Sequence, residues 1–384
     1  MHYRRFGRTD QRISVFSLGS MRLAHLPRQQ ADELVQQALN AGINHVETAP
    51  AYGASEELLG QILHALWGQP RSDGGGSWQR SDLVITTKVS PTLTAPQLTD
   101  SLKASLAKLQ LTYIDHLAFH GINLPEHLQA VISESWPAVE AALSSGMIRH
   151  IGFSTHAPLP LILEALATDR FAFINLHYHL LQQRNAPAVA AAHQRDLGVF
   201  IISPADKGGM LYSPPPLLSQ LCQPFSPLET AYRFLLADPR IHTLSLGVDR
   251  SEMIDQALQS LQDPQQWQTW GTQILNRLQI QAEASLGEDR CAQCYACLPC
   301  PAQVNIPEVL RLRNLAQAYA MQAYAEYRYN MFGMAGHWFP GVSADQCTEC
   351  GDCLPRCPHD LEIPKLLFDT HDRLHCSPIQ RLWE

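Results

Sequence analysis

Cysteine is almost absent before residue 290, where Cys222 stands alone, and no hydrophobic run reaches the ~18 to 20 residues that cross a bilayer. Basic side chains are also few: 28 Lys and Arg stand against 36 Asp and Glu, which gives a net charge of −8. These shortages argue against a membrane span and against a general attraction to nucleic acid. We therefore expect a soluble, cytoplasmic protein with neither partner. The 384 residues, 45% of them hydrophobic, exclude disorder and suffice for one large domain or two smaller ones.

The first 265 residues alternate short β-rich runs with amphipathic helical stretches. Strands separated in this way imply βαβ units and a parallel sheet. Eight units in about 250 residues is the size of a (β/α)8 TIM barrel. A doubly wound open sheet is the alternative, but its usual G-x-G-x-x-G turn does not follow the first strand. We predict an α/β barrel with strands at Ile13–Leu18, Ile43–Val46, Leu83–Thr87, Ile114–Phe119, Ile148–Phe153, Phe171–Leu176, Val199–Ile202 and Thr243–Leu246.

Ionisable residues follow three consecutive strands of this predicted barrel. The second strand runs into Glu47, with Tyr52 five residues later, the third ends in Lys88, and the fourth ends in His120. Each of them alone has an ordinary structural interpretation. Because the carboxyl ends of barrel strands carry the chemistry, we expect the four side chains to form one constellation.

Carbonyl reduction is the chemistry that such a group can perform. A tyrosine titrates near pH ~10 and needs a nearby cation to stabilise its phenolate, which Lys88 can supply. A carboxylate at Glu47 would keep the lysine charged and oriented, and His120 would help to polarise a carbonyl oxygen. A phenol that donates a proton to this oxygen assists hydride delivery to the carbon.

Several motifs in the same order resemble the aldo-keto reductase family over residues 1 to 265. They are the opening YRRFGRT at 3–9, GINHVETA at 42–49 followed by Tyr52-Gly53, SEELLG at 55–60, and IRHIGFS at 148–154. The resemblance implies a catalytic tetrad of Glu47, Tyr52, Lys88 and His120, a small-molecule carbonyl substrate, and NADP(H) or NAD(H) as cofactor. By position, it also implies cofactor-binding roles for Ser154, Asn175, Ser203, Lys207, Gly247 and Arg250.

Three positions depart from the family pattern. Glu47 stands where the family usually has aspartate, Ile202 where many relatives have an aromatic residue, and Gly247 where some have a lysine for the 2′-phosphate. The choice between NADP and NAD therefore stays open, with Arg250 as a candidate replacement for the missing charge.

The last 94 residues contain nine of the ten cysteines, and eight of these form two runs. The second run, C-x2-C-x2-C-x3-C-P, has the ligand spacing of bacterial ferredoxins, and the first run is shorter by one residue in its last gap. Ile-Pro and Leu follow each run at an offset of 57, so the region is an internal duplication, which argues for two equivalent metal sites. The ligand candidates are Cys291, Cys294, Cys297 and Cys300 in the first run and Cys347, Cys350, Cys353 and Cys357 in the second.

Zinc is the main competitor for these cysteines, but zinc sites usually separate two C-x2-C pairs. The short runs closed by Cys-Pro favour 4Fe-4S clusters, two expected and one at minimum. The region resembles two-cluster ferredoxin domains, in which the fourth cysteine of each run binds the other cluster. That resemblance implies one cluster on Cys291, Cys294, Cys297 and Cys357, and a second on Cys347, Cys350, Cys353 and Cys300.

We expect two domains joined by a linker: the barrel over 1–265, the linker over 266–284, and a mainly helical ferredoxin-like iron-sulfur domain over 285–384. Within the second domain we predict one or two helices over Pro307–Phe332. The last domain carries 12 acidic and 8 basic residues, which suits a redox partner with a basic patch. We expect an NAD(P)H-dependent carbonyl reductase whose cluster domain senses redox state, transfers electrons or docks a partner. The alternative is an electron-transfer protein whose barrel is a nucleotide-binding scaffold with little or no reductase activity.

Overall fold

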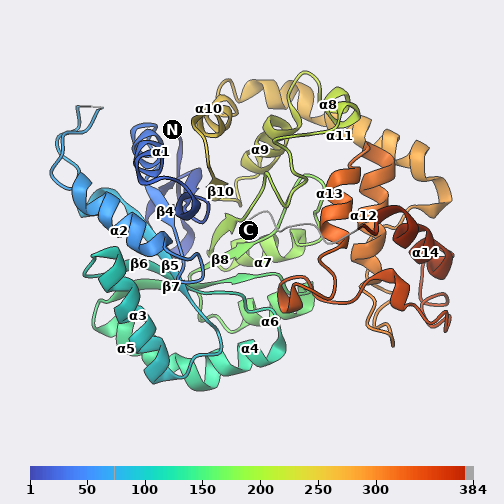
Figure 1. Cartoon of the computed structure of the whole chain (residues 1–384), viewed down its shortest axis with the longest axis horizontal. Helices are drawn as coiled ribbons and strands as arrows, with labels where there is room; N and C mark the ends of the chain where they lie inside the picture. Colours follow the sequence, from blue (N-terminus) through green and yellow to red (C-terminus); the bar gives the residue numbers. More distant parts are fainter. Residues whose placement is uncertain (73, 377–384) are drawn as a thin grey trace. The chain divides into compact units, whose positions relative to one another are not determined.

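The computed structural model describes residues 1–72 and 74–376, which form two compact units (Figure 1). The first unit contains Met1–Gly208 and Ala231–Pro264, and the second contains Gly209–Thr230 and the chain from Gln265 onward. Among the described residues, no helix combines the length and the apolar character that a membrane span requires.

Eight parallel strands of the first unit close into a barrel in the order β10, β3, β4, β5, β6, β7, β8, β9. The strands are β3 (Phe16–Gly19), β4 (His45–Glu47), β5 (Val84–Val89), β6 (Ile114–Phe119), β7 (Ile148–Thr155), β8 (Phe173–Leu176), β9 (Gly198–Ile201) and β10 (Thr243–Gly247). This confirms the predicted α/β fold and its (β/α)8 barrel. All residues of strands β5 and β6 are buried, as a parallel sheet that is covered on both faces requires.

Helices follow the strands and cover the outside of the barrel (Figure 1). They are α1 (Arg28–Asn40), α2 (Ser55–Leu66), α3 (Ala95–Leu109), α4 (Pro125–Ala130), α5 (Trp136–Ser144), α6 (Leu159–Ala167), α7 (Ala186–Gln194), α9 (Pro227–Ala237) and α10 (Ser251–Gln259). Local sequence explains their ends and faces. In α3, Thr94 and Gln97 form a capping box, and Leu98 and Leu102 bury one face against the barrel unit.

The first expected strand is divided in the structure. Its beginning belongs to β2 (Arg12–Ser14), which pairs antiparallel with β1 (Tyr3–Arg5), and only β3 joins the barrel. Phe6, which follows β1, is fully buried, and a Cβ atom on Gly198 would lie 2.6 Å from its ring. Phe6 therefore fills the barrel near the amino end of β9. The apolar run does not reveal this change of pairing partner.

The second unit is helical, with α8 (Pro216–Cys222), α11 (Gln265–Leu286), α12 (Ile306–Tyr319), α13 (Gln322–Tyr329) and α14 (Ile363–Leu374). Helices α12 and α13 occupy the stretch in which one or two helices are predicted. Residues 266–284, the expected linker, lie in α11, which packs on α12 and buries Ile274, Leu278 and Ala282. The Tyr319 hydroxyl donates to the Leu278 carbonyl at 3.0 Å and ties the two helices together.

Candidate active site and cysteine-lined hollows

Glu47, Tyr52 and Lys88 meet at the carboxyl ends of β4 and β5. Lys88 Nζ donates a hydrogen bond to Tyr52 Oη at 3.0 Å and another to the Glu47 carboxylate. Tyr52 Oη in turn donates to Glu47 Oε1 at 3.4 Å. The backbone oxygen of Thr48 accepts a further hydrogen bond from Lys88 Nζ at 3.0 Å. The ammonium is thus held by three oxygens, and the phenol lies against both charged groups.

His120 completes the predicted constellation from the end of β6. Its ring lies 5.5 Å from the Tyr52 ring, centroid to centroid, and the two planes are nearly perpendicular. The four predicted side chains therefore lie at one rim of the barrel, although two come from strands β4 and β5 and two from the segments that follow β4 and β6. Lys88 and Glu47 are buried, whereas Tyr52 and His120 are partly exposed. The constellation is therefore open to solvent on the side of Tyr52 and His120.

The electrostatics of the site keep the phenol protonated. Burial and the Glu47 carboxylate together raise the pKa of Tyr52 to about 12, although the Lys88 ammonium acts in the opposite direction. Burial also lowers the pKa of Lys88, but the Glu47 carboxylate and the Tyr52 oxygen outweigh it, so this pKa is raised and the lysine is charged. At neutral pH the site presents a proton donor beside a fixed cation, which suits a general acid.

Ser154 and Asn175 are direct neighbours on β7 and β8 at the same rim. Ser154 Oγ accepts a hydrogen bond from the Gly121 amide at 3.0 Å. Asn175 is fully buried, yet neither its side-chain oxygen nor its nitrogen has a partner among the described residues. An unpaired buried amide is costly. A nicotinamide carboxamide offers one donor group and one acceptor, so the residues present fit that cofactor.

A charged cluster links the loop after β9 to the end of β10. Arg22 Nη2 lies 3.0 Å from the Asp206 carboxylate, and its Nη1 lies 3.3 Å from both an Asp249 carboxylate oxygen and the Gly247 carbonyl oxygen. The sequence motifs do not indicate Arg22 as a site residue. Its position shortly after the first barrel strand was the available signal, because barrel chemistry sits at the carboxyl ends of strands.

The remaining cofactor candidates lie in this same region. Ser203 and Lys207 are half-buried in the loop after β9, and Ser203 has a positive φ of 51°. Gly247 ends β10, and a Cβ atom there would meet nothing within 4 Å. Arg250 is exposed and pairs with Asp249 at 2.9 Å. The open space at Gly247 leaves room for a ligand beside the barrel end.

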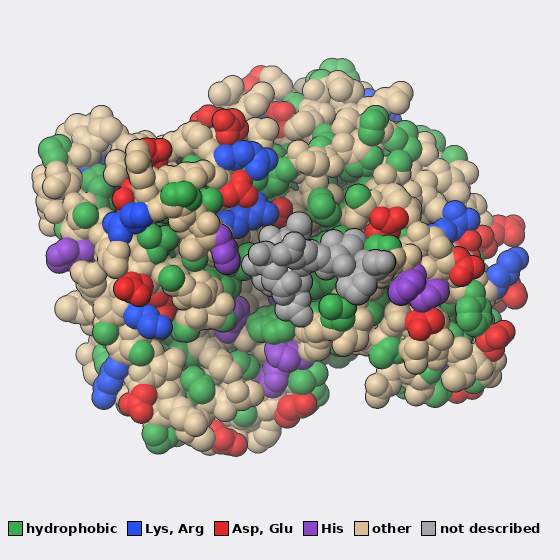
Figure 2. All heavy atoms as spheres, viewed as in Figure 1, with side chains coloured by type: hydrophobic (Ala, Val, Ile, Leu, Met, Phe, Trp, Pro, Cys, Tyr) green, Lys and Arg blue, Asp and Glu red, His purple; other side chains and the backbone are tan. Residues whose placement is uncertain are grey.

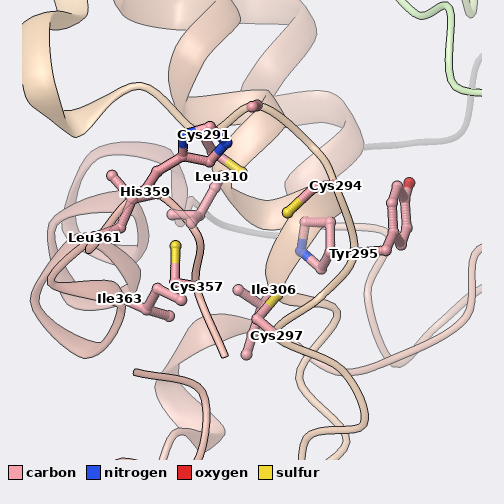
Figure 3. A pocket seen from close by; sticks show the side chains of 12 residues that line it. Cys291, Cys294, Tyr295, Cys297, Ile306, Leu310, Cys357, His359, Leu361 and Ile363 are labelled. Atoms are coloured by element: carbon pink, nitrogen blue, oxygen red, sulfur yellow. The ribbon is translucent and has the colours of Figure 1, made fainter. Parts of the chain in front are cut away.

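Four cysteines line a first hollow in the second unit (Figure 3). Three come from the first run and one from the end of the second run: Cys291, Cys294, Cys297 and Cys357. The hollow is otherwise lined by apolar residues such as Ile306, Leu310 and Ile363, and His359 lies at its edge. Apolar residues thus line much of the hollow, whereas Cys294 and His359 are exposed.

The other four cysteines line a second hollow, again with three from one run and one from the other: Cys347, Cys350, Cys353 and Cys300. Ile306 lines both hollows, so the two sites are adjacent within this unit. Pro307 and Leu310 line the first hollow, and their counterparts in the duplication, Pro364 and Leu367, line the second. The duplicated sequence therefore folds into duplicated sites.

The chemistry of the thiols fits metal ligation. All ten cysteines are described, and none forms a disulfide. Burial raises the pKa of Cys297 to about 12, with the neighbouring Cys291 and Cys294 adding to the effect, and burial likewise raises the pKa of Cys291 and Cys353. Such crowded thiols ionise together only when a cation compensates their charge. Cys222 and Cys376 line neither hollow.

Comparison with known proteins identifies two families in the chain. The family model described as "Aldo/keto reductase family" matches residues 16–213, and the one described as "4Fe-4S dicluster domain" matches residues 290–361. The first match spans half of the chain. The two matches fall on the barrel and on the cysteine-rich region.

Individual relatives cover the barrel part of the chain. An uncharacterized oxidoreductase, YqkF of Bacillus subtilis, is 23% identical over 68% of this chain and 91% of its own length. L-galactose dehydrogenase of Arabidopsis thaliana is 28% identical over 56% of this chain and 68% of its own. Among solved structures, the holo form of aldo-keto reductase AKR11C1 from Bacillus halodurans matches with a TM-score of 0.58 at 23% identity, covering 68% of this chain and 91% of that one.

Proposed function

The chain belongs to the aldo/keto reductase family, and on that premise we propose that it reduces an aldehyde or ketone to an alcohol with NAD(P)H. The observation that carries the proposal is the 3.0 Å hydrogen bond between Lys88 Nζ and Tyr52 Oη at the rim of the barrel. It supports the proposal because a protonated phenol beside a fixed cation can protonate a carbonyl oxygen and stabilise the negative charge that develops there. A reductase that transfers a hydride from a nucleotide to a carbonyl carbon also needs such a donor to protonate the carbonyl oxygen.

Each residue of the site has a different role in the proposed reaction. The bound nicotinamide would supply the hydride to the carbonyl carbon, and Tyr52 would give its phenolic proton to the carbonyl oxygen. Lys88 stabilises the phenolate that remains, and Glu47 keeps Lys88 charged within the protein. His120, edge-on to the Tyr52 ring, would orient the carbonyl oxygen toward the phenol. Solvent then restores the proton to Tyr52.

We assign Ser154 and Asn175 to the nicotinamide carboxamide, and Ser203, Lys207, Gly247 and Arg250 to the rest of the dinucleotide. Arg22 joins this set as the residue that holds Asp206 and the Gly247 carbonyl in place. The unpaired amide of Asn175 supports the assignment because a carboxamide would supply the two hydrogen bonds that it lacks.

Replacing Asn175 with leucine is expected to weaken NAD(P)H binding about tenfold, because the hydrogen bonds to the carboxamide are lost. The melting temperature is expected to stay constant or to rise, since the buried unpaired amide disappears. Nucleotide titration by fluorescence and thermal unfolding without nucleotide measure the two effects. Ser105→Ala is the matched control, because the Ser105 hydroxyl is also buried without a partner in the described chain but lies in α3. Equal nucleotide affinity in Asn175→Leu and the wild type would contradict the assignment.

Shortening Glu47 to aspartate, the usual residue of the family, is expected to lower the pKa of Tyr52. After burial, the Glu47 carboxylate is the next cause that raises this pKa, and a shorter side chain moves it away. Carbonyl reduction needs the protonated phenol, so activity falls as pH rises through the Tyr52 pKa. The alkaline limb of the kcat profile should therefore move to lower pH in Glu47→Asp. Glu57→Asp, on an exposed position of α2, is the control, and an unmoved limb would reject the argument.

We propose that residues 285–384 hold two 4Fe-4S clusters, one on each set of four cysteines. The two hollows support this, because each is lined by three cysteines of one run and the fourth of the other. The spacing of the runs, C-x2-C-x2-C closed by Cys-Pro, favours a cluster over zinc. The acidic charge of this region suits a redox partner with a basic surface.

An electron-transfer protein with a nucleotide-binding barrel is the second candidate function. Iron-sulfur clusters transfer single electrons, whereas a nicotinamide transfers a hydride. The sequence has no flavin motif that would couple the two kinds of transfer, and this favours the second candidate. Titrating the purified protein with NADPH and NADH in the presence of an aldehyde panel separates the two. Turnover supports the reductase, and nucleotide binding without turnover supports the scaffold.

A further inference from the structure

The two cysteine runs differ in length by a single residue. After their third cysteines, the first run reads Leu298-Pro299-Cys300 and the second reads Leu354-Pro355-Arg356-Cys357. The residue present in the second run and missing from the first is therefore Arg356. Apart from this position, the Leu-Pro and Cys-Pro elements of the two runs correspond. The duplication has kept the ligands. The second run also has Glu349 and Asp352 where the first has Gln293 and Ala296, and Arg356 is the one basic residue within the two runs.

Arg356 is fixed in place by two backbone carbonyls. Its Nε donates to the Asp352 carbonyl at 2.7 Å, and its Nη2 donates to the Pro299 carbonyl at 3.0 Å. The second contact reaches back to the shortened first run, at the residue before Cys300. Both anchors are neutral carbonyl groups, and no carboxylate of the described residues forms an ion pair with the guanidinium group.

Arg356 lines the second hollow and not the first. Arg356 lines the second hollow together with Cys300, Cys347, Cys350 and Cys353. The residues that line the first hollow include no Lys or Arg within the described chain, and its polar members besides cysteine are Tyr295 and His359. Asp352 also lines the second hollow, but its side chain is exposed, whereas Arg356 is half-buried, so water screens the Asp352 charge in part and more strongly than that of Arg356.

We propose that Arg356 makes the two cluster sites unequal by raising the reduction potential of the cluster on Cys347, Cys350, Cys353 and Cys300. This rests on the proposed function of the cysteine sites. Reduction adds one electron, and thus one negative charge, to a cluster, and a fixed cation stabilises the reduced form. The first electron that enters the domain therefore resides at the second site, and the first site is the weaker electron acceptor.

Potentiometric titration of the full-length protein followed by electron paramagnetic resonance tests this. The wild type should show two midpoint potentials, and Arg356→Gln should lower the higher one while leaving the other in place. We expect at least a tenfold change in the distribution of the electron between the sites, which corresponds to about 59 mV for a one-electron couple. Arg356→Lys should preserve the separation. Lys365→Gln, which removes an exposed cation from α14, should leave both potentials unchanged.

A second variant keeps the test decisive if Arg356→Gln disturbs folding. Asp352→Asn removes a negative charge from the same hollow without touching the backbone carbonyl that Arg356 binds, so it should raise the higher potential. Movement of the lower potential in either variant, or no movement in both, would overturn the proposal. Iron and sulfide analysis precedes the titration, so the absence of clusters would count against the proposed function and not against the role of Arg356.

Discussion

Tyr52→Phe is expected to lower the rate of carbonyl reduction by at least about a thousandfold, because the variant has no proton to give to the carbonyl oxygen. Tyr52 Oη is the group that contacts both Lys88 and Glu47, so its removal takes away the acid and leaves its two partners paired with each other. Nucleotide affinity should change little, since the proposed carboxamide contacts come from other strands. Steady-state turnover with an aldehyde that the wild type reduces, together with nucleotide titration, separates the two properties.

Tyr113→Phe provides the matched control for this experiment. Tyr113 immediately precedes β6, at the opposite end of the barrel, where its ring stacks under the guanidinium groups of Arg80 and Arg149. The same loss of a hydroxyl there should leave turnover unchanged. Retained turnover in Tyr52→Phe would remove the tetrad assignment, whatever the behaviour of the control.

Cys357→Ser is expected to destroy the same cluster as Cys291→Ser, although Cys357 belongs to the other cysteine run. The reason is that both cysteines line the first hollow, whereas Cys353 lines the second. Each single variant should keep about four of the eight irons of the wild type. The double variant Cys291→Ser/Cys357→Ser should lose no more iron than either single variant. In contrast, Cys291→Ser/Cys353→Ser should lose both clusters.

Anaerobic purification, followed by iron and sulfide analysis and electron paramagnetic resonance, measures these losses. Cys222→Ser and Cys376→Ser should retain full iron content, because neither cysteine lines a hollow. Further iron loss in Cys291→Ser/Cys357→Ser would show that each run holds its own cluster. A colourless protein that contains zinc would replace the iron-sulfur interpretation altogether.

The barrel is predictable from the sequence because its strands are buried on both faces and are separated by helical periodicity. Ile114–Phe119, predicted as a strand, forms β6 with the same limits. The division of Ile13–Leu18 is not predictable in this way, since both halves are apolar and only their pairing partners differ. Phe6, which follows β1, is fully buried, and this burial is a tertiary feature that the local sequence does not predict.

The candidate site is predictable to the extent that strand ends converge in a barrel. Lys88 and Glu47 end adjacent strands, so the fold alone brings them together. The sequence does not predict the net effect on Tyr52: Lys88 acts to lower its pKa, as expected, but burial and Glu47 act in the opposite direction and prevail. The sequence does not indicate a role for Arg22, because its partners Asp206 and Asp249 are distant in sequence and approach it only in the closed barrel.

Transfer of deuterium from NADPH labelled at the reactive position of its nicotinamide ring is the most direct measurement of the proposed reaction. The purified protein is incubated with this nucleotide and a panel of carbonyl compounds that includes nitrobenzaldehyde, phenylglyoxal and glyceraldehyde, and the products are analysed by mass spectrometry. We predict deuterium on the carbon that bears the new hydroxyl group, in the wild type and not in Tyr52→Phe. Nucleotide that binds but transfers no deuterium to any of these compounds would contradict the account and would make the barrel a binding scaffold.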